Sequence, residues 1–215
     1  MNMIFELILV IPILLLSLSI HEFSHGMASY KKGDPTPKMQ GRLTLNPLSH
    51  LDPMGALVLL LTRRFGWAKP VPINPRYYSN PRRDMMVVSV AGPASNFALA
   101  LIFALALNLV GIFASGPLAM RMYGQSGGLL MITVQFLYLA VIINVSLGIF
   151  NLLPVPPLDG SKILRGVLPP SYDRYLNQLE GPLGMMLLLV LAFTGILGAI
   201  IGPIVQMVLG LMVFV

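Results

Sequence analysis

Residues 3–30 form an apolar run long enough to cross a bilayer as one helix, and this limits the fold more than any other stretch. Near the end of the run stands the pentapeptide His21-Glu22-Phe23-Ser24-His25. A charged side chain at bilayer depth costs roughly 2.5 to 3.5 kcal/mol, so ionisable residues in such a place are expected to serve a function.

The spacing of the two histidines predicts a metal site. Side chains four residues apart point the same way on a helix, so His21 and His25 can hold one ion together. Glu22 is then placed to take a proton from a water that the metal activates. This is the H-E-x-x-H pattern of zinc hydrolases. Two solvated surface histidines flanking a glutamate, or a helix cap or polar network without metal, are the alternatives. Neither is favoured, because water cannot carry these charges inside an apolar run.

The composition places the chain in the membrane. Of its 215 residues, 56% are hydrophobic and only 10% are charged, whereas soluble domains carry about 25% charged residues. The formal net charge of +6 does not indicate a nucleic-acid partner, because the basic residues fall in loops beside apolar runs, as topology charges do. The absence of cysteine excludes thiolate metal ligands and disulfides.

We therefore predict an all-α polytopic membrane protein with a three-span core. The apolar stretch 53–62 is too short to span and predicts a re-entrant or interfacial helix, and the preceding 38–46 predicts a short strand pair. The C-terminal run 182–215 predicts an apolar helical hairpin divided at Gly202-Pro203. The expected parts are a core of residues 1–165, with spans at 3–30, 85–112 and 128–153 and a re-entrant region at 37–62, and a C-terminal loop and hairpin at 166–215.

The distribution of basic residues predicts that a third metal ligand lies at the same membrane face as the histidines. Basic loops stay in the cytoplasm, which puts residues 31–84 inside and the first motif toward the cytoplasmic end of its span. Asp159, at the end of a proline-rich turn after the third span, then emerges at the same face. A catalytic zinc takes three protein ligands and keeps one position open. His21, His25 and Asp159 supply that count, and Glu22 remains as the general base.

Other polar residues are candidates for the substrate region. His50 is the only further histidine; it is a third ligand or, as its loop position favours, a pocket-lining residue. Asn96, in the small-residue stretch Gly92–Asn96, is expected to hydrogen-bond between helices. Asn144 and Asn151 lie on the third span.

The motifs together resemble the site-2 protease family of intramembrane zinc metalloproteases. The resemblance rests on four stretches: H-E-F-S-H-G at 21–26, N-P-L-S-H-L-D-P-M-G at 46–55, G-P-A-S-N at 92–96 and N-L-L-P-V-P-P-L-D-G at 151–160. It implies one zinc on His21, His25 and Asp159, with Glu22 as base. It also implies that Asn151 and Asn144 assist in the substrate or transition-state region, and that 38–46 pairs with unwound substrate.

The predicted function is cleavage of peptide bonds within transmembrane protein substrates, at the cytoplasmic side of the cell membrane. The loops are too short to hold an inserted PDZ domain and no soluble nucleotide-sensing domain follows the third span, so we expect a compact member. The alternative is a metal-binding transporter or sensor, which is expected to show ionisable residues deep in other spans; the second and third spans have none. An inactive scaffold for membrane segments is disfavoured by the intact ligand set.

Overall fold

The computed structural model describes residues 3–62, 66–114 and 117–214, and in these ranges the chain is built of helices without strands. The only β-type pairing among these residues is an isolated antiparallel bridge between Leu51 and Ala68. The predicted all-α class is thus confirmed, but the strand pair expected at 38–46 is not found. Helix α2 (Thr36–Met39) takes up the start of that stretch, because Pro37 favours the first turn of a helix.

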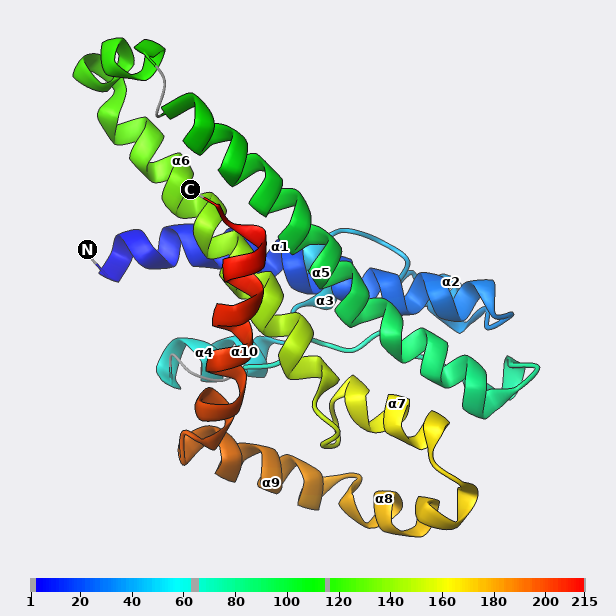
Figure 1. Cartoon of the computed structure of the whole chain (residues 1–215). Coiled ribbons are helices and arrows are strands. Elements are labelled where there is room, and N and C mark those ends of the chain that lie inside the picture. The colour runs from blue at the N-terminus through cyan, green and yellow to red at the C-terminus, as the bar shows by residue number, and fades with distance from the viewer. Residues whose placement is uncertain (1–2, 63–65, 115–116, 215) are drawn as a thin grey trace.

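Three long helices make up the core: α1 (Met3–Lys31), α5 (Pro81–Ala114) and α6 (Pro117–Leu152). Each contains an apolar stretch of membrane-spanning length, which confirms the three predicted spans. In Figure 1, α5 and α6 run antiparallel side by side and α1 crosses them. The candidate span within α6 is Gly128–Leu152, close to the predicted 128–153. The helix itself begins earlier, at Pro117, because proline is well accommodated at a first helical position.

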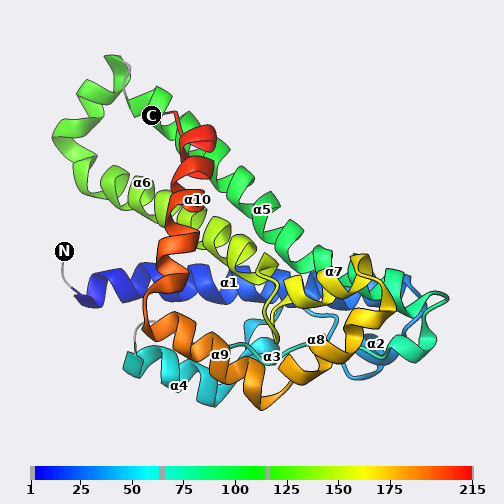
Figure 2. The same ribbon diagram turned by 60° about the horizontal axis from the view of Figure 1, so that its bottom comes forward.

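Short helices join α1 to α5. They are α2, α3 (Pro47–His50), α4 (Pro53–Thr62) and the 3-10 turn η1 (Pro75–Tyr77). Helix α4 has the bounds predicted for the short apolar helix. In Figure 2, α3, α4 and α9 lie on the same side of α1.

After α6 the chain turns into α7 (Asp159–Val167), η2 (Pro170–Tyr172) and α8 (Asp173–Leu179), then into α9 (Pro182–Phe193) and α10 (Ile196–Met212). The predicted C-terminal helix pair is present, but its division at Gly202-Pro203 is wrong. The break falls at Gly195, whose φ of +79° lies in the left-handed region that glycine tolerates. Pro203 lies inside α10, as prolines can in membrane helices.

The far end of α10 is fixed to α5 by one side chain. The Asn108 amide donates to the carbonyl of Met212 at 2.7 Å, and its oxygen accepts from the N–H of Phe214 at 3.0 Å. These bonds satisfy backbone groups that a helix end leaves without partners.

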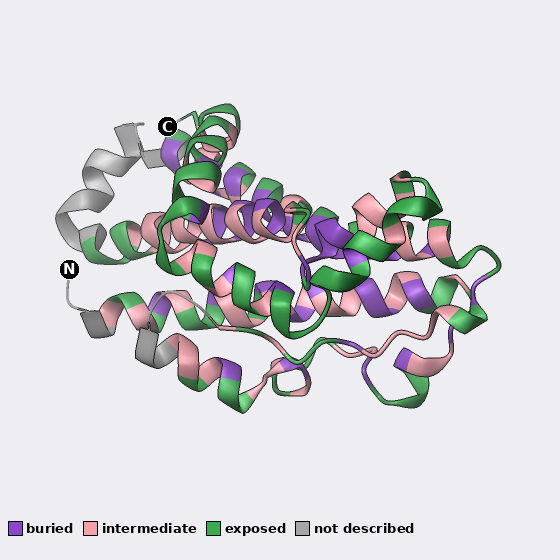
Figure 3. Cartoon of the chain, turned by 90° about the horizontal axis from the view of Figure 1, so that it is seen from below, coloured by how far each residue is buried: buried purple, intermediate pink, exposed green. Residues whose placement is uncertain are grey.

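The core lies where the three long helices pack. Small and β-branched side chains fill it, and Figure 3 shows buried residues following these central helices while the outer faces of the shorter ones are exposed. Ala100, Ala104, Val141 and Val145 are almost completely buried. Because alanine lets helix backbones approach closely in lipid, polar side chains at the same crossing can reach across it.

A buried carboxylate ties the segment before α5 to the end of α1. Asp34 is fully buried and accepts hydrogen bonds from the Ser29 hydroxyl at 2.8 Å, the Thr36 N–H at 2.9 Å and the Asn74 N–H at 2.8 Å. Burial alone raises the pKa of Asp34, but these hydrogen bonds outweigh it and hold the pKa below its ordinary value. The extended residues 68–74 are thereby held beside α1.

Candidate metal centre

Three buried side chains, two on α1 and one at the start of α7, bring their ligand atoms to one point. The Nε2 atoms of His21 and His25 are 3.0 Å apart. The Oδ2 atom of Asp159 lies 3.2 Å from the first and 3.0 Å from the second. The structure thus brings together the residues that the sequence predicted as a ligand set, although 134 positions separate His25 from Asp159.

The second ring nitrogen of each imidazole, Nδ1, is held by an oxygen on α5. The Nδ1–H of His25 donates to the carbonyl of Val88 at 2.8 Å, and the Nδ1–H of His21 donates to Oδ1 of Asn96 at 2.6 Å. A neutral imidazole that carries its proton on Nδ1 presents a lone pair at Nε2. With that tautomer on both histidines, two lone pairs and a carboxylate oxygen converge, an arrangement that suits a metal cation.

The spacing of the three atoms suits zinc. Bonds of about 2.0 to 2.1 Å in a tetrahedral site put ligand atoms about 3.4 Å apart, and the observed separations are 3.0 to 3.2 Å. Two histidines and a carboxylate also match the ligand number of a catalytic zinc, which keeps a fourth position open. The second carboxylate oxygen of Asp159 faces Lys162, whose Nζ lies 3.4 Å away, so the two oxygens have separate partners.

Gly92 leaves the space next to the ligand atoms free. A Cβ at this position would lie 2.3 Å from Nε2 of His25 and 2.6 Å from Nε2 of His21. Sequence reasoning treated this stretch as small residues for helix packing and as part of the family resemblance, without a role at the metal site. The missed signal is its spacing: Val88, Gly92 and Asn96 are each four residues apart, so they form one stripe of α5 that faces the histidines.

Glu22 is held by the backbone of the extended segment. Its Oε2 accepts the N–H of Val71 at 2.8 Å, and the side chain is partly buried. The sequence did not predict the contact, because Val71 carries no chemical signal of its own.

The remaining candidates lie elsewhere or act differently. His50 is buried outside the ligand cluster; its Nε2 donates to the Thr44 carbonyl at 2.8 Å, and its Nδ1 faces Arg42 at 3.5 Å. It lines a cavity, as favoured from the sequence. Asn96 hydrogen-bonds between helices, as expected, and Asn144 contacts it at 3.1 Å. Asn151 donates to the Leu147 carbonyl of its own helix at 3.0 Å.

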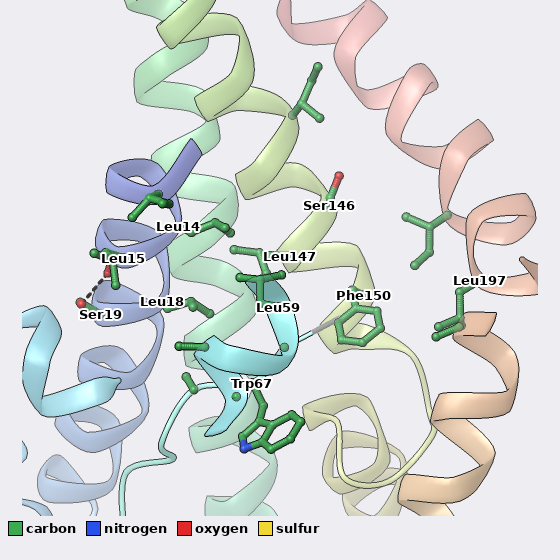
Figure 4. A pocket seen from close by; sticks show the side chains of 18 of the residues that line it. Leu14, Leu15, Leu18, Ser19, Leu59, Trp67, Ser146, Leu147, Phe150 and Leu197 are labelled. Atoms are coloured by element: carbon green, nitrogen blue, oxygen red, sulfur yellow. Dashed lines mark hydrogen bonds between the residues drawn. The ribbon is translucent and has the colours of Figure 1, made fainter. Parts of the chain in front are cut away.

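An apolar cavity of about 790 Å³ lies between α1, α4, α6 and α10. Figure 4 shows Leu14, Leu15 and Leu18 of α1 on one side, with Leu147 and Phe150 of α6 and Leu197 of α10 on others. Leu18 is one helical turn before Glu22, so the cavity-lining face of α1 leads to the carboxylate.

Comparison with known proteins agrees with this geometry. A model described as peptidase family M50 matches residues 9–195. The chain is 40% identical over 190 residues to the Bacillus subtilis protein named "Putative zinc metalloprotease YwhC", covering 88% of this chain and 82% of that protein. It is 33% identical over 192 residues to "Putative zinc metalloprotease Rip2" of Mycolicibacterium smegmatis, covering 87% of this chain and 67% of that protein.

A more distant relative is "Zinc metalloprotease MJ0392" of Methanocaldococcus jannaschii, 26% identical over 119 residues and matched over 54% of this chain and 30% of that protein. No solved structure matches significantly. The family match favours the hydrolase over the transporter, sensor and scaffold alternatives. With three apolar helices and a clustered histidine–aspartate ligand set, the chain belongs to peptidase family M50, the family of the site-2 proteases, and is a multi-pass membrane zinc metalloprotease.

Proposed function

We propose that this protein cleaves peptide bonds within transmembrane segments of other membrane proteins, with Glu22 as the general base and one zinc ion per chain. The observation that carries the proposal is the convergence of three buried acceptor atoms at 3.0 to 3.2 Å beside a glutamate that is one residue from the first ligand. His21, His25 and Asp159 would hold the ion.

When bound, zinc supplies a Lewis acid that polarises a carbonyl and lowers the pKa of water toward ~7. The residues of the chain supply the rest. Glu22 accepts a proton from the attacking water as the C–O bond forms, and then passes it to the nitrogen of the departing amine as the C–N bond breaks. The Val71 N–H holds one carboxylate oxygen through this cycle, so that the other oxygen carries the proton.

The apolar cavity supports a transmembrane substrate. Its lining is mostly apolar, and it lies along the face of α1 that continues to Glu22. A substrate helix seated there meets side chains like those of the lipid it leaves, and its polar backbone becomes exposed only where it unwinds near the site. Asn151 and His50 remain proposed contacts of this region.

We further propose that the site opens toward the cytoplasm. Helix α1 ends at Lys31, six residues after His25, and Lys32 follows directly; six residues are a rise of roughly 9 Å along a helix. Basic residues near span ends favour the cytoplasmic face of the cell membrane.

The test is Glu22→Gln in the purified protein and in cells. We expect this variant to bind zinc like wild type and to lose cleavage, and we expect single-span membrane proteins to accumulate in membranes that carry it. Glu6→Gln is the matched control, since Glu6 is an exposed glutamate in the first turn of the same helix. Wild-type cleavage by purified Glu22→Gln would reject the role of the base.

A further inference from the structure

We propose that Asn144 of α6 is a positioning residue that fixes the metal-binding tautomer of His21 through Asn96. The inference rests on the zinc site proposed above. Asn144 and Asn96 are both completely buried, and Nδ2 of Asn96 donates to Oδ1 of Asn144 at 3.1 Å. The hydrogen bonds of Asn144 go to Asn96 and to the Ala140 carbonyl rather than to a metal ligand, so its action on the site passes through Asn96.

The direction of each hydrogen bond follows from groups that can only accept. The carbonyl of Ala140 accepts from Nδ2 of Asn144 at 2.9 Å, which turns the Asn144 oxygen toward Asn96. That oxygen can only accept, so the amide nitrogen of Asn96 must face it. The Ser17 carbonyl, 3.4 Å from the same nitrogen, requires the same orientation.

The orientation of Asn96 then decides where His21 carries its proton. With the Asn96 nitrogen engaged, its Oδ1 faces Nδ1 of His21 at 2.6 Å and can only accept. His21 therefore carries the proton on Nδ1 and presents the lone pair of Nε2 to the ion. A reversed Asn96 amide would donate to Nδ1 and move the proton to Nε2, where it would occupy the ligand position.

Removing the Asn144 oxygen weakens the preference between these two orientations. Asn144→Leu keeps a side chain of similar size but offers Asn96 no acceptor. We expect zinc to bind about tenfold more weakly, measured by competition with a chelator of known affinity, as outer hydrogen-bond partners of metal ligands typically contribute 10- to 100-fold. For Asn96→Leu we expect a loss of zinc affinity within the same 10- to 100-fold range.

A double variant tests the path through Asn96. Because Asn144 acts only through Asn96, the Asn96→Leu/Asn144→Leu protein is expected to bind zinc no more weakly than Asn96→Leu alone. Additive losses would overturn the proposal. Asn108→Leu is the matched control: it removes an intramembrane asparagine of α5 that makes two hydrogen bonds far from the ligands, and its zinc affinity should equal that of wild type.

A conservative variant separates orientation from folding. Asn144→Asp has the same shape and keeps an oxygen that can accept the Asn96 amide hydrogen. We expect its zinc affinity to stay within about threefold of wild type. Wild-type affinity in Asn144→Leu, or equal losses in the leucine and aspartate variants, would overturn the inference. A wild-type protein that binds no zinc would instead reject the proposed function itself.

Discussion

At the scale of single residues, the site depends on what surrounds the ligands as much as on the ligands. Oxygens of Val88 and Asn96 hold the two imidazoles with their Nε2 atoms inward. Gly92, between them on α5, leaves the adjoining space free. A glycine inside a helix lowers its stability by roughly 0.5 to 1 kcal/mol relative to alanine, so its presence there is explained by space rather than by helix formation.

Gly92→Ala is therefore expected to abolish tight zinc binding while leaving the helix intact. The added methyl group would lie 2.3 Å from Nε2 of His25, well inside van der Waals contact. We expect at least a tenfold loss of zinc affinity, because losing an outer hydrogen-bond partner of a ligand already costs 10- to 100-fold and here a ligand itself is displaced. Gly210→Ala, on α10 with open space around its position, is the control that should bind normally. Equal zinc binding by both variants would contradict this role.

The metal ligands could be predicted from the sequence, but the groups that hydrogen-bond to them and to Glu22 could not. The i, i+4 histidines and the acidic residue after the proline turn carry their chemistry in their residue types. Val88 and Val71 act through backbone groups, which every residue has, so only the fold reveals them. Asn96 and Asn144 were noticed as polar residues in apolar spans, yet their order in a hydrogen-bonded chain depends on how α5 and α6 pack.

At the scale of elements, the segment 68–74 holds the Glu22 side chain in place. It is fixed at both ends: the Lys69 N–H donates to the His50 carbonyl at 2.9 Å, and the Asn74 N–H donates to Asp34 at 2.8 Å. Between these points the Val71 N–H reaches Glu22. The segment lies between elements distant in sequence, which explains why local patterns did not predict its position.

Val71→Pro removes the N–H that holds Glu22 and exchanges a buried valine side chain for an apolar ring. Pro70 and Pro72 already restrict the backbone on both sides of this position. A hydrogen bond to a charged group is worth about 1.5 to 3 kcal/mol, so we expect kcat to fall roughly 10- to 100-fold with zinc content unchanged. Val71→Thr, which keeps the N–H and the branched shape, is the control. Full activity in the proline variant would show that this hydrogen bond is dispensable.

At the scale of the whole molecule, the three long helices and α10 determine on which side of the membrane each connecting segment lies. If residues 31–84 are cytoplasmic, α5 leads outward, α6 returns and Asp159 emerges beside the histidines. The two hydrogen bonds of Asn108 to the end of α10 then place Phe214 near the outer end of α5. The three spans were predictable from apolar length, whereas the break at Gly195 was not, because glycine and proline occur both inside and between membrane helices.

The chain has no cysteine, so single cysteines report this topology cleanly. Met39 and Phe214 are each 80% exposed and lie at opposite predicted faces. We expect a membrane-impermeant thiol reagent added to intact cells to label Phe214→Cys, and to label Met39→Cys only after the membrane is opened. The reverse pattern would place the site on the outer face.

The most direct test of the central claim is the zinc-to-protein ratio of purified wild type, His25→Ala and Asp159→Ala, measured by elemental analysis. The geometry predicts close to one zinc in wild type and almost none in either variant, because each removes one of three converging ligand atoms. Wild-type zinc content in Asp159→Ala would contradict a shared ion between α1 and α7, and with it the proposed catalytic site.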